Sequence, residues 1–393
     1  MNYRLRMDNS MKKIRVLQVT SGFRKGVSGG IPSVLHNYCT APAFEEEFHF
    51  EYLSLGYQTF EPYREDLEKR GGVLHCLGIH SSGIKRNFDI VIKLYRFLKT
   101  HRNEFDIIHI NSGALVQVLM CSVSARLATK SAVIVHSHNA VEKPLSRKLI
   151  YSLLKPLFYR TADMYFACSN MAAQSMFPQG VLKRKSWKLI YNAIDVKRFG
   201  YNAEVRERYR KELGVSNKFV IGHVGRFNEQ KNHTFLIRTF KEITERDSET
   251  VLLLIGTGEL ENQIKNMVND LKIKDKVLFL GQRSDVNNLL QAMDCFAFPS
   301  LYEGLGMVLI EAQASGLDII ASDSVPIEET RITDRICYLP LDIKAWAEEI
   351  LRHKSYERKD NASNVSEAGY DLIHATEKLK RYYFEAIDIK NRI

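Results

Sequence analysis

Two glutamates stand eight residues apart within the segment from Pro299 to Ser322. Glu303 falls in a loop opened by glycines, and Glu311 falls inside Met307 to Ala314, whose residue types favour a helix. With a rise of about 1.5 Å per residue, the span from the first helical amides to the Glu311 carboxylate is roughly that of a nucleoside diphosphate. Those amides and the helix dipole favour an anion such as the diphosphate itself. The alternatives for these carboxylates are ordinary surface positions on an amphipathic helix and, in principle, a general acid/base pair of the glycosidase kind.

Two basic residues stand five positions apart after another apolar run. Arg226 and Lys231 belong to the sequence GRFNEQKN, which follows the predicted strand Val220 to Val224, and Asn232 or His233 is placed to begin a helix. Arginine grips a phosphate with its planar fork, and lysine adds a mobile point charge. The pair predicts an anion site, with a solvated surface turn as the alternative.

A glycine-rich loop, Gly26 to Ile31, follows the predicted strand Ile14 to Val19. We expect the next helix to begin at about Ile31 or Pro32. Glycines at this place let the backbone approach an anion at the start of the helix, and proline suits a first helical turn. The alternative is a flexible surface turn.

Histidines mark a further strand end. His136 and His138 occur in the order VHSHN at the end of the apolar run that begins at Val133. A histidine in this position orients a hydroxyl or takes part in proton transfer, and a hydrogen-bonded loop residue is the alternative. We do not expect zinc, because two histidines at i and i+2 on an extended strand have no further ligands nearby.

Composition indicates a globular protein of two domains. The chain has 393 residues, of which 45% are hydrophobic and 26% are charged. Its cysteines are scattered without a CxxC pair, and no apolar leader follows the charged start, so we expect a reduced, cytoplasmic protein. No run of eighteen apolar residues occurs, so no membrane span is expected.

The positive charge is concentrated in the first half of the chain. Residues 1–200 carry 29 Lys and Arg against 15 Asp and Glu, a net of +14, whereas the remainder has a net of −4. Lys143 to Arg160 mixes five basic residues with apolar ones, and Lys183 to Lys185 adds a second cluster. The longer segment is suited either to an anionic membrane surface or to an amphipathic helix packed on the core. Nucleic acid is not expected, because no binding motif accompanies the charge.

Short apolar runs alternate with helical lengths along the whole chain, which predicts an α/β protein with two doubly wound parallel sheets. Residues 195–218 read as the connection between them, with a short helix. Because ligands of such sheets gather at the carboxyl ends of the strands, we expect the chemistry in a cleft between the two domains. The predicted strands are Ile14–Val19, Phe48–Leu55, Val73–Leu77, Ile107–Ile110, Val133–His136, Met164–Ala167, Lys188–Tyr191, Val220–Val224, Val251–Ile255, Val277–Leu280, Cys295–Phe298, Asp318–Ala321 and Ile336–Leu339.

Taken together, these motifs resemble those of the retaining glycosyltransferases of family four, two-domain enzymes with the GT-B fold. The resemblance extends from about Lys13 to the C terminus, and within the family it is most similar to bacterial enzymes that assemble exopolysaccharide or capsule. Its landmarks are GGI, HSHN, Asn192-Ala193-Ile194-Asp195, GRFNEQKNH, Gly256-Thr257-Gly258-Glu259-Leu260, and the two glutamates separated by seven residues.

The resemblance implies a role for each matching residue. Arg226 and Lys231 would neutralise the diphosphate leaving group, and Glu311 would accept hydrogen bonds from the ribose hydroxyls. Glu303 would lie near the donor sugar and His138 beside the reacting sugar, with His136 as the alternative. The implied catalytic set is His138, Glu303, Arg226 and Lys231, and the implied donor-binding set is Gly29, Gly30, Arg226, Lys231, Gly304, Leu305, Gly306, Met307 and Glu311.

The resemblance also implies how the chain is organised and what it does. Residues 1–195 would form a Rossmann-like acceptor domain, with a helix of about 370–393 packing back on it, and residues 196–369 would form a Rossmann-like domain for the nucleotide sugar. The expected reaction is transfer of a sugar, with retention, from a UDP-linked donor to a lipid-linked extracellular or capsular polysaccharide repeat unit. No metal or cofactor is expected, and no DxD sequence occurs. The expected partners are the donor, the lipid-linked acceptor and the inner face of an anionic membrane. A nucleotide-sugar epimerase on the same fold and a catalytically silent partner protein are the alternatives.

Overall fold

The computed structural model describes residues 13–23, 30–138, 161–184, 186–355 and 357–392. The chain forms two compact units, and each is described by itself. Unit 1 comprises Met1–Ala193 together with Leu372–Ile393, and unit 2 comprises Ile194–Asp371. The last helix of the chain therefore belongs to the same unit as its first strand.

Unit 1 is built on a sheet of seven parallel strands in the order β3-β2-β1-β4-β5-β6-β7. Helices cover both faces of such a sheet, and every residue of β4 and β5 is accordingly buried. The strands are β1 (Ile14–Thr20), β2 (Phe48–Ser54), β3 (Val73–Cys76), β4 (Ile107–Ser112), β5 (Ala132–Ser137), β6 (Met164–Ala167) and β7 (Lys188–Leu189).

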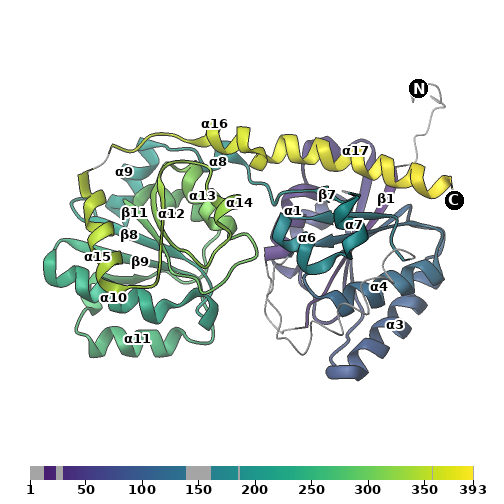
Figure 1. The fold of residues 1–393 in the computed structure, drawn as a ribbon, viewed down its shortest axis with the longest axis horizontal. Coiled ribbons are helices and arrows are strands. Elements are labelled where there is room, and N and C mark those ends of the chain that lie inside the picture. Colours follow the sequence, from purple (N-terminus) through teal and green to yellow (C-terminus); the bar gives the residue numbers. More distant parts are fainter. Residues whose placement is uncertain (1–12, 24–29, 139–160, 185, 356, 393) are drawn as a thin grey trace. The chain divides into compact units, whose positions relative to one another are not determined.

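The helices of unit 1 form two layers, one on each face of the sheet (Figure 1). They are α1 (Gly30–Cys39), η1 (Pro42–Phe44), η2 (Glu61–Tyr63), α2 (Arg64–Lys69), α3 (Gly83–Thr100), α4 (Leu115–Ala128), α6 (Asn170–Met176), α7 (Gln179–Lys183) and α17 (Leu372–Asn391). On one face, α3 and α4 pack together over Leu17 of β1. On the other face, α1 and α17 cover Val16, the preceding residue, because side chains alternate along a strand.

Unit 2 has a sheet of six parallel strands in the order β10-β9-β8-β11-β12-β13. Its two central strands are β8 and β11, which pair in register at Ile221 and Cys295. The loops that follow these two strands therefore leave the sheet side by side. The strands are β8 (Phe219–Val224), β9 (Thr250–Ile255), β10 (Val277–Phe279), β11 (Cys295–Phe298), β12 (Asp318–Ser322) and β13 (Ile336–Leu339).

The helices of unit 2 again lie on both faces (Figure 1). They are α8 (Val196–Phe199), α9 (Ala203–Glu212), η4 (Glu229–Lys231), α10 (His233–Arg246), α11 (Glu261–Asp270), η5 (Lys274–Lys276), α12 (Val286–Ala292), α13 (Met307–Ala314), α14 (Ile327–Thr330), α15 (Ile343–Arg352), η6 (His353–Ser355), α16 (Ala362–Val365) and η7 (Ser366–Tyr370). The core of one face contains residues of α10, α11 and α15, including Trp346, which is fully buried. The core of the other contains residues of α12 and α13, including Leu309.

The predicted α/β fold with two doubly wound sheets is confirmed, and every predicted strand is present with bounds shifted by two residues or fewer. Helix α1 begins at Gly30, within one residue of the expected start. The stretch 195–218 holds two helices, α8 and α9, and Asp195 caps the first by accepting from the amide of Arg198. Among the described residues, no helix combines the length and apolar character needed to cross a membrane.

Candidate active site

Two loops of unit 2 meet at the carboxyl edge of its sheet. One loop follows β8 and carries Gln230, and the other follows β11 and carries Leu301 and Tyr302. The amide of Leu301 donates to the carbonyl of Gln230 at 2.8 Å, and the side-chain amide of Gln230 donates to the carbonyl of Tyr302 at 2.9 Å. These bonds join the loop that holds the predicted cations to the loop that holds Glu303.

Lys231 and Glu303 form an ion pair between these loops. The distance from Lys231 Nζ to Glu303 Oε1 is 2.6 Å, and the side chains are 16% and 8% exposed. The Lys231 ammonium also lies 4.6 Å from the centre of the Phe298 ring, which adds a cation–π contact. Asn228 fixes the backbone by accepting from the Lys231 amide at 3.1 Å. The lysine is therefore held in one place by its charge partner, an aromatic ring and a capped turn.

Arg226, the second predicted cation, is paired with a carboxylate that the predicted set did not contain. Arg226 Nη2 lies 2.9 Å from Glu259 Oε2, and the side chains are 34% and 51% exposed. Glu259 belongs to the Gly256-Thr257-Gly258 turn after β9. A Cβ on Gly258 would lie 2.4 Å from the carbonyl oxygen of Phe227, so glycine is required for the two loops to touch. In the sequence, the pattern Gly256-Thr257-Gly258 indicates this contact, because glycines allow two loops to approach closely.

Gly225 leaves room for the lysine. A Cβ at Gly225 would lie 2.8 Å from His223 Nε2 and 3.1 Å from Lys231 Cγ. The aliphatic stem of Lys231 therefore passes directly over the glycine of the GRF sequence. A larger residue there would clash first with the His223 ring and would crowd the Lys231 stem.

The loop before α13 ends in a left-handed residue. Gly306 has φ of 76° and ψ of 59° at the N-cap of α13, a conformation that favours glycine. Met307 then begins the helix, Leu305 is buried, and Gly304 is partly buried. Helix-start amides have no partner inside the helix, so the turn from Gly304 to Met307 presents donors suited to an anion.

Glu311 lies one turn into α13 and is partly buried. Burial raises the pKa of its carboxyl to about 7, and the positive charge of Arg198 opposes that rise. At neutral pH the group is thus divided between its charged and neutral forms. A ligand that donates hydrogen bonds to Glu311 would favour the charged form.

His138 follows β5 in unit 1 and takes part in a buried hydrogen-bond chain. Its Nε2 lies 3.0 Å from Asn111 Oδ1. The amide nitrogen of Asn111 donates to Gln18 Oε1 and to the carbonyl oxygen of His109, at 2.9 and 3.0 Å. Gln18 in turn donates to the hydroxyl of Tyr383 on α17 at 2.9 Å. The last helix of the chain therefore supports the side chain predicted to lie beside the reacting sugar.

The histidines of this region are neutral. Burial lowers the pKa of His138 to about 4, and the nearby Asn192 side chain partly opposes that fall. Burial also lowers the pKa of His109 and of His136 well below the usual range. The rings of His136 and His138 lie 3.9 Å apart, and both nitrogens of His136 are buried. None of the three is suited to neutralise a phosphate as a cation.

Other predicted residues of unit 1 are placed as follows. Gly30 is the first residue of α1, and a Cβ there would meet nothing within 4 Å. Gly29 and the basic segment Lys143 to Arg160 lie outside the described residues. Lys231 and Glu303 are brought together in unit 2, which also holds Arg226 with its partner Glu259, Gly304 to Met307, and Glu311. His138 and Gly30 belong to unit 1, at the carboxyl edge of its own sheet.

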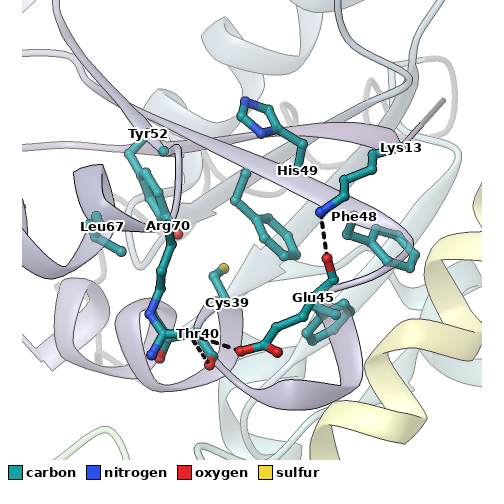
Figure 2. Close-up of a pocket in the computed structure, with 12 residues that line it drawn as sticks. Lys13, Cys39, Thr40, Glu45, Phe48, His49, Tyr52, Leu67 and Arg70 are labelled. Carbon is teal, nitrogen blue, oxygen red and sulfur yellow. Dashed lines mark hydrogen bonds and ion pairs between the residues drawn. The ribbon is translucent and has the colours of Figure 1, made fainter.

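A cavity of about 260 Å³ opens at the opposite edge of unit 1, near the amino ends of β1 and β2. Figure 2 shows two basic side chains at its rim. Lys13 Nζ donates to the carbonyl of Glu45 at 2.5 Å, and Arg70 Nη1 donates to the carbonyl of Thr40 and to the Glu45 carboxylate, both at 3.2 Å. The basic groups are therefore already engaged, and the cavity lies away from the strand ends that carry His138 and Gly30.

Comparisons with known proteins agree with the two-unit organisation. Residues 30–198 match Glycosyltransferase Family 4, and residues 205–371 match Glycosyl transferases group 1. The putative glycosyltransferase EpsF of Bacillus subtilis is 31% identical over 374 residues, which cover 92% of this chain and 94% of that protein. The UDP-Gal:alpha-D-GlcNAc-diphosphoundecaprenol alpha-1,3-galactosyltransferase of Escherichia coli is 26% identical over 317 residues, covering 76% and 79%.

Solved structures share the fold. Anabaena Alr3699/HepE in complex with UDP matches with a TM-score of 0.74 at 19% identity, covering 95% of this chain and 100% of that chain. Sucrose-phosphate synthase from Thermosynechococcus elongatus matches with a TM-score of 0.68 at 17% identity, covering 95% and 99%. The sequence match over nearly the full chain and the two Rossmann-like units lead to the same assignment: the chain belongs to the glycosyltransferases of family four and has the GT-B fold.

Proposed function

We propose that the protein is a retaining glycosyltransferase that moves a sugar from a UDP-linked donor to a lipid-linked polysaccharide repeat unit. The observation that carries this proposal is the Lys231–Glu303 pair, 2.6 Å long, which joins the loop after β8 to the loop that leads into α13. It brings a cation next to a glycine turn and a helix start. Positive charge and free backbone amides at one place suit a diphosphate.

The proposed role of the cations is to stabilise the leaving group. As the bond to the sugar breaks, negative charge develops on the diphosphate, and Arg226 and Lys231 supply the opposite charge. Glu259 and Glu303 keep the two cations oriented, while Glu311 accepts from the ribose hydroxyls. In metal-dependent transferases a metal cation neutralises the diphosphate. Here these side chains would do so without a metal ion, so we expect activity to persist in the presence of a chelator.

The proposed lipid-linked acceptor is supported by the name of one relative and by the net positive charge of the first half of the chain. The Escherichia coli relative is named for a diphosphoundecaprenol-linked substrate, and a UDP-linked donor appears in the same name. The net charge of +14 in residues 1–200 suits an acceptor that carries a diphosphate at a lipid surface. We therefore place the protein in the cytoplasm, peripherally on the inner face of the membrane, in the assembly of an extracellular or capsular polysaccharide.

The experiment that tests the proposal is a screen of purified protein with nucleotide sugars and a lipid diphosphate acceptor, with products identified by mass spectrometry. The anomeric configuration of the product is then determined by NMR. We expect Arg226→Ala and Lys231→Ala to lower turnover at least about 100-fold, in line with the loss of a charge that stabilises a leaving group. Lys241→Ala is the control, because Lys241 pairs with Glu245 on the surface of α10. Unchanged turnover in the first two variants would overturn the assigned roles.

The same screen separates the two alternatives. An epimerase would convert the sugar of the donor into an isomer without any acceptor. A silent partner protein would bind neither UDP nor GDP in calorimetry. Transfer that requires the lipid acceptor, with unaltered sugar in the remaining donor, would exclude both.

A further inference from the structure

Helix α3 exposes three large apolar side chains on one side. Ile84, Phe88 and Ile92 are 76%, 64% and 46% exposed. They are spaced four residues apart, so each is offset from the next by only about 40° around the helix axis. We call these three residues the α3 stripe. It is separate from the side of α3 that packs on the sheet, which consists of Ile90, Leu94 and Leu98, all fully buried.

Basic residues flank the α3 stripe. With about 100° of rotation per residue, Lys85, Arg96 and Lys99 fall on the same side of the helix as the stripe. All three are exposed. Over its whole length α3 contains five basic residues and one acidic residue, Asp89, and within the described part of the chain no ion pair joins its basic residues to a carboxylate. Asp89 also falls near this side, where it accepts from Ser81, so one carboxylate stands against three cations and the net charge of this side is positive.

The α3 stripe lies toward the carboxyl edge of the unit 1 sheet. Lys93 Nζ is 3.3 Å from the carbonyl oxygens of Leu77 and Gly78, which directly follow the last residue of β3. The part of α3 that precedes Lys93 therefore extends toward and past this edge. His138 follows β5 at the same edge. Figure 1 shows α3 beside α4 at the periphery of the unit.

We propose that the α3 stripe, with Lys85, Arg96 and Lys99, docks unit 1 onto the surface of an anionic lipid bilayer. A helix with apolar side chains on one side and an excess of cations beside them suits the boundary between headgroups and acyl chains. Each cation near such a surface adds to the binding, and the apolar side chains enter the boundary. This inference rests on the proposed function, because docking through the α3 stripe would bring the sheet edge that carries His138 to the lipid layer in which a lipid-linked acceptor resides.

The charge and size of the stripe argue against a second copy of the chain as its occupant. In a symmetric pair the flanking cations of the two copies would face one another, which is unfavourable. Three side chains also cover far less than the roughly 800 Å² that each partner contributes to a stable interface. An anionic surface instead complements the cations and needs no large area from a single helix.

The first test is sedimentation of the full chain with phospholipid vesicles, either phosphatidylcholine alone or phosphatidylcholine with about one third phosphatidylglycerol, a mixture chosen for its anionic surface. We expect binding to the anionic vesicles only. The double variant Phe88→Ser with Ile92→Ser should weaken that binding at least about tenfold, because the apolar contribution is removed. Ile373→Ser is the matched control. Ile373 is 60% exposed on α17, which packs on the opposite face of the same sheet.

A second pair of variants separates charge from apolar contact. Lys85→Glu with Arg96→Glu should abolish binding to anionic vesicles, whereas Lys211→Glu on α9, also exposed, should leave it unchanged. Wild-type binding should also fall as salt is raised. All of these residues are exposed, and circular dichroism will confirm that each variant is folded.

The outcomes are distinct. Equal vesicle binding by the stripe variant and the wild type would overturn the inference. A wild-type dimer in light scattering that the stripe variant loses, without vesicle binding, would assign the α3 stripe to a second copy instead. UDP affinity is measured by calorimetry on the same samples, without vesicles. Failure of the wild type to bind UDP would contradict the proposed function and leave the vesicle result unaffected.

Discussion

Lys231 Nζ and Glu303 Oε1 lie 2.6 Å apart, so the cation predicted to neutralise a diphosphate is paired with the carboxylate predicted to lie near the sugar. Both side chains are largely buried, at 16% and 8% exposure. Removing one partner from such a pair leaves the other charge uncompensated away from water, which costs more than the net contribution of the pair. Stability and catalysis are therefore coupled at this point, and a single substitution does not separate them.

A pair of substitutions separates stability from function here. We expect Lys231→Met to lower the free energy of unfolding by about 3 kcal/mol, because the Glu303 carboxylate loses its partner. Adding Glu303→Gln removes the stranded charge and should restore most of that stability, but not sugar transfer. Urea unfolding and donor turnover measure the two effects. Lys241→Met is the control: its partner Glu245 is 57% exposed on the same helix, and the loss of this pair should cost less than about 1 kcal/mol. Full turnover in the double variant would show that the Lys231 charge is not used.

Glu311 should make stability depend on pH. Its pKa is raised by burial from 4.5 to about 7 in the folded protein, so between these values the folded state binds more protons than the unfolded state. The free energy of unfolding therefore falls as pH rises from about 4.5 to about 7 and stays lower above that. A shift of this size corresponds to about 3 kcal/mol. Glu311→Gln removes this effect, so the variant should be more stable than the wild type at pH 8, and the difference should vanish near pH 4. A difference that is constant with pH would contradict the assignment.

The affinity for the donor should also depend on the titration of Glu311, but it should rise with pH. The charged carboxylate is the stronger acceptor for ribose hydroxyls, so the affinity for a UDP-sugar should rise between pH 6 and pH 8, around the Glu311 pKa of about 7. A nucleotide sugar is the appropriate ligand because both of its phosphates are esterified and do not titrate near pH 6, unlike a phosphate monoester. In Glu311→Gln the affinity should be lower and independent of pH over this range. Calorimetry at several pH values provides the measurement.

The strands were predictable from the sequence, whereas the partners of the site residues were not. Apolar runs bounded by polar residues and glycine determine where strands such as β11 begin and end. The order of strands in the sheet decides which loops meet, and that order cannot be read from spacing along the chain. Lys231 meets Glu303 because β8 and β11 are neighbours, although 72 residues separate the two side chains. Asn111 meets His138 because β4 and β5 are neighbours.

The sequence alone also did not predict which side of α3 is exposed. Apolar residues occur on several sides of this helix, so periodicity alone does not distinguish Phe88, which is exposed, from Leu94, which is fully buried. The packing of α3 on α4 and the sheet decides which side is covered. The roles of His138, Glu303, Glu311 and the glycines stay predictions, and the structure supplies the distances with which they are tested.

The tautomer of His138 follows from its neighbours. The carbonyl oxygen of His109 only accepts, so the Asn111 atom 3.0 Å from it is the amide nitrogen, and Asn111 Oδ1 faces His138. The His138 proton must then reside on Nε2. Since burial lowers the pKa of His138 to about 4, the ring is neutral at pH 7, and Nδ1 keeps a free lone pair. Nδ1 has no hydrogen-bond partner among the described residues but is fully buried, so a substrate hydroxyl would reach it only after a neighbouring group moved.

Nitrogen-15 NMR of labelled histidine checks this assignment directly. We expect the Nε2–H tautomer for His138 from pH 5 to pH 8. Asn111→Asp places a carboxylate at Nε2 and should raise the His138 pKa, since a nearby negative charge favours the protonated ring. Asn111→Leu removes the acceptor at Nε2, so His138 should lose its preference for the Nε2–H tautomer. The exposed ring of His80 serves as an internal reference in the same spectra. An Nδ1–H tautomer in the wild type would contradict the assignment.

Gly30 provides a test of backbone approach to the donor. A Cβ at this position meets nothing within 4 Å, so Gly30→Ala should fold normally and melt at the wild-type temperature or slightly above it, because alanine restricts the unfolded chain. If the diphosphate approaches the Gly30 backbone as proposed, the added methyl group should raise the KM for the nucleotide sugar at least about tenfold, the effect expected when a close contact is blocked. Thermal unfolding and initial rates are measured on the same preparation. A variant with unchanged KM and unchanged melting temperature would show that the donor does not approach Gly30 and would remove this residue from the donor site.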